Sequence, residues 1–126
     1  MTKYSAAAAD LLPLREPTFY ILLSLIEGEK HGYAILKEVE VLSQGTVRLS
    51  TGTLYEGLAR LLEQSLIERV PDKKEENQGQ GNQSHPGKPR KAYLLTHFGK
   101  QVLEAETQRL RTLVTAAYQR LGPQGA

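Results

Sequence analysis

The sequence predicts a mainly α-helical fold with one small β hairpin and a long C-terminal helix. Three observations support this fold class. Apolar residues recur at helical spacing in three segments before residue 65. Two short runs rich in Leu, Ile, Val and Tyr flank a long loop of Gly, Gln, Asn and Lys, as the strands of a hairpin do. A final stretch of about 25 residues keeps an apolar heptad pattern and ends before Gly122-Pro123.

Composition limits the class of protein. The chain has 126 residues, 40% of them hydrophobic, which is enough for one domain with a packed core. The net charge of +2 is too small to indicate a nucleic-acid partner, so the local distribution of charge must decide. The absence of cysteine excludes disulfides and thiolate chemistry. No segment reaches the roughly 20 apolar residues of a membrane span and no secretory signal opens the sequence, so we expect a cytoplasmic location.

We divide the chain into an N-terminal arm over residues 1–16, a helical domain with a hairpin over residues 17–96, and a C-terminal helix over residues 97–121. The arm is rich in alanine and leucine. It is either a frayed tail or a segment that places its leucines on a partner subunit. Pro17 suits the first turn of the next helix because its missing N–H is not needed there, and Gly28 ends that helix.

Two further helices follow in the central domain. One is expected from about Gly32 to Ser43, and the next from about Ser50 to Gln64. Apolar and polar residues alternate in the linker between them, which predicts a brief strand over residues 47–49. Two closely spaced helices with a short linker are typical of a helix-turn-helix.

The third helix of this domain is the candidate recognition helix. Leucines at helical spacing turn one of its faces inward, so the other side of its first turn is small, polar and exposed. Small residues let a helix end enter a DNA major groove, and hydroxyls there bond phosphates or base edges. The alternative is that these hydroxyls only cap the helix. The candidate DNA-binding residues here are Ser50, Thr51, Gly52, Thr53 and the flanking Tyr55.

The hairpin strands are expected over residues 66–70 and 90–95, joined by a loop over residues 71–89. The second half of this loop is basic and contains proline and glycine, which suits contact with the DNA backbone or the minor groove. A plain solvated loop is the alternative, because acidic residues in the first half partly cancel the lysines there. The candidate DNA-binding residues of this hairpin are Lys88, Arg90 and Lys91.

The last helix carries an apolar seam with alternating spacings of four and three residues. At 1.5 Å per residue, a helix of about 25 residues is about 37 Å long, which is more than so small a body can cover. We therefore favour a seam between two copies of the chain over packing on its own domain. The candidate dimerisation residues are Leu103, Leu110, Val114, Ala117 and Leu121.

Three strings in this order resemble the PadR family of bacterial transcriptional regulators. They are His-Gly-Tyr at residues 31–33, Ser-Thr-Gly-Thr-Leu-Tyr at residues 50–55, and Lys-Ala-Tyr-Leu-Leu-Thr at residues 91–96. The match covers roughly residues 17–99, and the Gly-Thr-Leu-Tyr string is quite specific in that setting. The single C-terminal helix resembles the short-tailed branch of the family.

The resemblance implies a winged helix-turn-helix, a homodimer held by the C-terminal helix, and repression of nearby promoters. It places Tyr33 and Tyr55 near the DNA backbone and makes Tyr93 a brace between the wing and the core. The sequence departs from the family pattern at Glu56, where proline is frequent, and at Ser65, where glycine is frequent. The wing is also longer than is usual in the family.

We therefore expect a sequence-specific transcriptional regulator, a repressor that binds a palindromic operator in double-stranded DNA as a homodimer. The alternative is a winged-helix module that binds proteins and not DNA. We do not expect an enzyme, a cofactor or a metal, because the three histidines are far apart and no phosphate loop or nucleophile motif occurs. A small-molecule effector of unknown identity is left open, with a crevice between residues 11–19 and the last helix as its candidate site.

Overall fold

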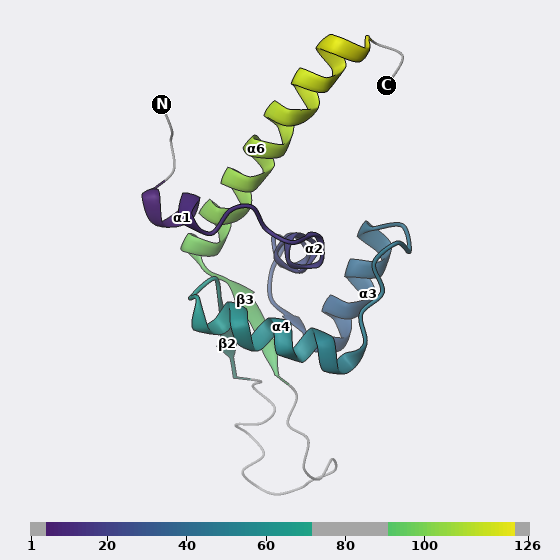
Figure 1. Ribbon diagram of the computed structural model, residues 1–126. Helices are drawn as coiled ribbons and strands as arrows, with labels where there is room; N and C mark the ends of the chain where they lie inside the picture. The colour runs from purple at the N-terminus through teal and green to yellow at the C-terminus, as the bar shows by residue number, and fades with distance from the viewer. Residues whose placement is uncertain (1–4, 72–90, 123–126) are drawn as a thin grey trace, which may run out of the picture.

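The computed structural model describes residues 5–71 and 91–122, whose arrangement is shown in Figure 1. Five helices and one small antiparallel sheet make up this part of the chain, so the predicted fold class is confirmed. The helices are α1 (Ala6–Asp10), α2 (Glu16–Ser24), α3 (Gly32–Leu42), α4 (Thr51–Glu63) and α6 (His97–Leu121). The strands are β1 (Lys30–His31), β2 (Ile67–Val70) and β3 (Ala92–Leu95).

The α2 helix carries Pro17 in its first turn, as predicted, but it ends earlier than the sequence indicates. The N–H groups of Leu25 and Ile26 donate to carbonyls three residues back, which tightens the end of the helix into a turn. Gly28 then adopts a φ of 142°, a conformation that favours glycine, and leads the chain into β1.

The brief strand predicted over residues 47–49 is wrong, because these residues are irregular. The N–H of Val47 donates to the Ser43 hydroxyl oxygen at 2.9 Å, and the Thr46 hydroxyl donates to the Ser43 carbonyl at 2.8 Å. Side-chain hydrogen bonds at the end of α3 thus hold the linker in a turn, and it joins neither edge of the described sheet.

The predicted hairpin is confirmed as β2 and β3, but the sheet has a third strand that the sequence did not reveal. The strand order is β1-β3-β2, with Lys30 opposite Tyr93 and Ile67 opposite Leu95. The β1 strand has two residues, which is too short to show the alternation by which a strand is recognised. It ties the entry of α3 to the base of the hairpin.

The hydrophobic core lies where α2, α3, α4 and the base of α6 meet the sheet. Figure 1 shows α4 running across one end of the molecule, while α6 extends away from the opposite end. Because α4 uses its leucine face in this core, its other side faces solvent. The largest fully buried apolar side chains are Leu22, Leu25, Ile35, Leu54, Leu58, Leu66, Ile67, Val39 and Val102.

Residues 5–16 of the N-terminal arm pack on their own chain, and this overturns the expectation of a frayed tail for this part of the arm. Its α1 helix lies against α6, and Ala8 is fully buried between them. The N–H of Leu14 donates to the Glu106 carboxylate at 3.1 Å, and Arg109 donates two hydrogen bonds to the same carboxylate at 2.7 and 2.8 Å. The leucines of the arm are partly buried against the core of the protomer, where the alternative had placed them on a partner.

The base of α6 approaches the start of β2 very closely. The Thr96 hydroxyl accepts from the N–H of Gly99 at 2.9 Å, which caps the helix. The same hydroxyl contacts the carbonyl oxygens of Ser65 and Leu66 at 2.7 and 3.0 Å. A Cβ atom on Gly99 would overlap the Leu66 carbonyl oxygen, so only glycine fits this contact.

We predict that Gly99→Ala destabilises the protein by about 1–3 kcal/mol, because backbone atoms must shift to admit the methyl group. Urea denaturation followed by circular dichroism measures this free energy. The control is Gly57→Ala in α4, where the new Cβ meets only the Ile21 side chain at 3.8 Å. That variant should gain up to about 1 kcal/mol from helix propensity. Equal stabilities for the two variants would contradict the contact at Gly99.

We predict a pH-dependent loss of stability for Glu106→Gln. The Arg109 hydrogen bonds, supported by the Leu14 N–H, hold the pKa of the buried Glu106 carboxyl below its usual value of 4.5. A carboxyl with a lowered folded-state pKa stabilises the protein above its unfolded-state pKa, and this contribution is lost as the pH falls through the folded-state pKa. The variant should therefore be less stable by about 1.5–3 kcal/mol at neutral pH, and the difference should shrink in acid.

Urea denaturation at neutral pH and in acid tests this prediction. Glu104→Gln is the matched control, since Glu104 is an exposed carboxylate on the same helix. An exposed substitution of this kind changes stability by no more than about 0.5 kcal/mol. A stability loss of the same size for Glu106→Gln at every pH would show that the ionised carboxylate is not what fixes the arm.

Candidate nucleic-acid interface

The first turn of α4 is small, polar and exposed, as the sequence predicts. Ser50 is the N-cap residue: its hydroxyl oxygen accepts from the Thr53 N–H at 3.1 Å. The two hydroxyl oxygens also lie 3.0 Å apart in an exposed hydrogen bond. The capping interpretation therefore holds for Ser50, while the side chains of Thr51 and Thr53 and the Cα of Gly52 face solvent. No charged side chain lies in this turn.

Tyr55 explains why glycine stands at position 32. The Tyr55 ring lies over the start of α3, and a Cβ atom on Gly32 would overlap its hydroxyl oxygen. The first two sequence strings that resemble the family thus meet in space. The Tyr55 side chain nevertheless remains 41% exposed, so part of it faces solvent beside the first turn of α4.

Tyr33 lies beside this contact on the first turn of α3. Its side chain is 69% exposed, whereas tyrosine side chains in folded proteins are usually buried to a larger extent. The Lys37 ammonium lies 5.7 Å from the centre of the ring, a cation–π geometry that adds positive charge next to the tyrosine. The start of α3 therefore presents an aromatic and cationic surface next to the exposed turn of α4.

Tyr93 lies within the sheet beneath these residues. It belongs to the buried core cluster, and burial raises the pKa of its hydroxyl, with a further increase from the nearby Tyr55. The hydroxyl therefore stays neutral at physiological pH. Its burial fits the bracing role that the family resemblance implies for this residue.

The wing is defined here as β2, β3 and the loop between them, and its strand β2 packs beside α4 (Figure 1). Lys91 is exposed and directly precedes β3. Lys88 and Arg90 lie outside the described residues. The exposure of Lys91 leaves its ammonium group accessible, and its role in DNA binding stays a prediction.

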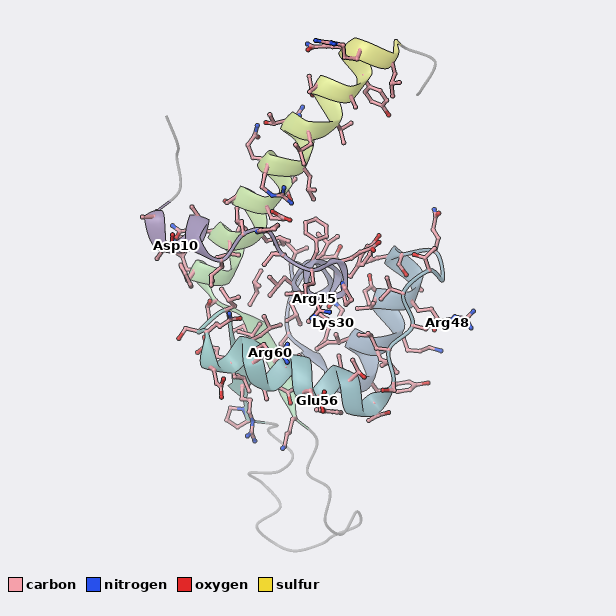
Figure 2. All side chains as sticks on the ribbon, viewed as in Figure 1. Asp10, Arg15, Lys30, Arg48, Glu56 and Arg60 are labelled. Carbon is pink, nitrogen blue, oxygen red and sulfur yellow. The ribbon has the colours of Figure 1, made fainter. Side chains whose placement is uncertain are left out.

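A cleft of about 200 Å³ lies between α2 and α4 and was not predicted from the sequence. Arg15, at the start of α2, and Arg60, on α4, both line it (Figure 2). Thr53 and Glu56 of α4 line it as well, so the cleft borders the exposed turn. No motif marks Arg15 in the sequence, because only the fold brings it beside α4.

The second half of α6 projects from the body with an exposed apolar face. Val114 and Leu121 are 48% and 71% exposed, and Ala117 is exposed on the same side of the helix. Leu110 is half-buried where the helix leaves the body. Leu103, which the seam prediction included, is only 4% exposed and packs in the core of its own chain. It therefore does not contribute to an intermolecular face.

Within residues 5–71 and 91–122, no three side chains of His, Asp or Glu are grouped as a metal site. None of the helices in the same part of the chain is long and apolar enough to cross a membrane.

Three helices and a short three-stranded sheet, with the β2–β3 hairpin beside α4, define a winged helix-turn-helix protein. Residues 21–105 match the model of the transcriptional regulator PadR-like family, and the chain belongs to this family. Members of the family regulate transcription and are not enzymes. The resemblance in the three sequence strings is thereby confirmed.

Solved structures agree with this assignment. A PadR family transcription regulator from Clostridium difficile R20291 is 29% identical, with a TM-score of 0.63 over 86% of this chain and 100% of that one. A PadR-like regulator from Bacillus cereus is 24% identical, with a TM-score of 0.60 over 94% and 98%. Bacillus subtilis PadR, solved in complex with operator DNA, is 23% identical, with a TM-score of 0.56 over 72% and 47%. A search of curated proteins gave no significant match.

We predict that Gly52→Ala separates stability from DNA binding. A Cβ atom at Gly52 has nothing within 4 Å in the protein, so alanine should stabilise α4 by up to about 1 kcal/mol. On a surface that approaches bases closely, the same methyl group should weaken DNA binding by roughly tenfold. Thermal denaturation and fluorescence anisotropy measure the two effects. A more stable variant with unchanged affinity would remove Gly52 from the interface.

Proposed function

We propose that this protein is a sequence-specific regulator that binds double-stranded DNA, with the first turn of α4 in the major groove. The observation that carries the proposal is the exposed, uncharged turn at Thr51, Gly52 and Thr53, because it leaves room and hydroxyl groups for base edges. Tyr33 and Tyr55 lie on one flank of this turn and would meet the backbone. The wing would follow the backbone through Lys91, Lys88 and Arg90.

We further propose that two copies pair through the exposed face of α6, defined by Leu110, Val114, Ala117 and Leu121. Apolar side chains on a projecting helix gain stability when a second copy covers them. A two-fold dimer would place two copies of α4 about one DNA turn, roughly 34 Å, apart and would read a palindromic operator. We expect this dimer to be cytoplasmic and to repress transcription by occupying a promoter. An effector would act by changing the distance between the two α4 helices.

The similarity to Bacillus subtilis PadR supports this proposal at the level of the fold, since that protein was solved with operator DNA. Selection of bound duplexes from random DNA with the full-length protein tests it directly. Enrichment of a palindromic sequence is the expected result. If no sequence is enriched and the protein does not retard duplex DNA at low salt, the protein-interaction alternative becomes the better explanation.

We predict that Val114→Glu converts the dimer to a monomer. A carboxylate at this position would have to be buried without a partner in the dimer, while in a monomer it is solvated, so the fold of the protomer should not change. Light scattering measures the mass, and gel retardation should show loss of operator binding.

Gln119→Glu is the control for this variant. Gln119 is nine residues from Leu110, and at about 100° per residue it lies on the opposite side of α6. The control adds the same charge to the same helix and should remain dimeric. A Val114→Glu protein that still scatters light as a dimer would refute pairing through this face.

A further inference from the structure

We infer that the cleft between α2 and α4 is a binding site for a phosphodiester group of the DNA backbone, held by Arg15 and Arg60. The inference rests on the DNA binding proposed above and extends it to residues that no sequence motif marks. In the complex with DNA, these arginines would contact the backbone on the side of α4 opposite Tyr33 and Tyr55.

The cleft has the size and lining of an anion site. Its volume of about 200 Å³ accommodates one phosphate-sized group, and Figure 2 labels Arg15 and Arg60, the two arginines that line it. Arg15 and Thr18 contribute from α2, and Thr53 and Arg60 contribute from α4. Two cationic side chains and two hydroxyl groups therefore border one concave surface, and these are the groups that most often contact phosphate oxygens.

The charges at this site are available for a ligand. Arg15 and Arg60 are both exposed, and neither forms an ion pair with another described residue. Two other arginines differ in this respect, because Arg48 lies 3.4 Å from Glu40 and Arg109 is bound to Glu106. A guanidinium group without a carboxylate partner keeps its full set of donors for phosphate.

The position of the cleft relative to α4 supports DNA as the source of the phosphate. The major groove is about 12 Å wide, and a helix with its side chains is about 10–12 Å across, so both DNA strands flank a helix that enters it. At about 100° per residue, Tyr55 and Arg60 lie on opposite flanks of α4, with Gly52 between them. If one strand meets the tyrosine flank, the other meets the flank with the cleft.

Glu56 also lines the cleft, and its carboxylate opposes a phosphate there. It precedes Arg60 by one helical turn, a spacing at which an arginine offsets the charge of a glutamate. The site retains a net positive charge because Arg15 is added from α2. This arrangement lets a carboxylate stay on the DNA-facing side of α4 without repelling the duplex.

The test is the salt dependence of DNA binding by the Arg15→Ala/Arg60→Ala double variant of the full-length chain. Each phosphate contact contributes about 0.9 to the slope of log affinity against log salt. The variant should lose about one such unit and should weaken binding to the selected duplex and to an unrelated duplex by the same factor, because phosphate contacts carry no base information. Arg60→Lys keeps the charge and should retain most of the slope.

Arg120→Ala is the control, because Arg120 is an exposed arginine in the last turn of α6, far from α4 (Figure 1). Wild-type binding with an unchanged slope in the double variant would overturn the inference and leave the proposed function intact. An equal loss in Arg120→Ala would also overturn it, since the effect would then come from net charge. Absence of DNA binding by the wild-type protein would overturn the proposed function itself. Circular dichroism confirms that the variants are folded.

Discussion

The contact between the first turn of α6 and the start of β2 fixes the position of the C-terminal helix relative to the winged helix-turn-helix. Gly99 lets the helix backbone approach the Leu66 carbonyl, and the Thr96 hydroxyl joins the helix cap to the same strand entry. Since β2 follows directly from α4, this contact connects the projecting helix to the helix that we propose reads DNA. The base of α6 cannot change its direction without disturbing the wing or the core beneath α4.

A second constraint holds α6 from its other side. The buried Glu106 carboxylate accepts hydrogen bonds from Arg109 and from the backbone of Leu14, so the N-terminal arm is fixed along the helix. A buried charge of this kind is costly unless it is fully hydrogen-bonded, and here both oxygens are occupied. The arm and the start of β2 together fix the first half of α6, and the second half projects with an exposed apolar face.

Much of this fold follows from patterns that are local in the sequence. The leucines of α4 and the cap at Ser50 are visible because one helix buries one face. The β1 strand is not visible, because two residues show no alternation and their partner, β3, lies some 60 residues further on. The packing of the arm was not predicted, because its backbone is held by Glu106, and a charged residue on a helix does not indicate a buried contact. The cleft shared by Arg15 and Arg60 depends entirely on how two helices pack, and no spacing within the chain encodes it.

The straight course of α6 has a mechanical consequence. A helix of 25 residues measures about 37 Å, so tilting it by about 5° at its base displaces its tip by about 3 Å. A small rearrangement of the side chains around the first turns of α6 would therefore move the other end of the helix by about the rise of one base pair. In a symmetric dimer the displacements from the two α6 helices would add. Slight repacking near the sheet would then be enough to align the two α4 helices with the half-sites of the DNA or to misalign them.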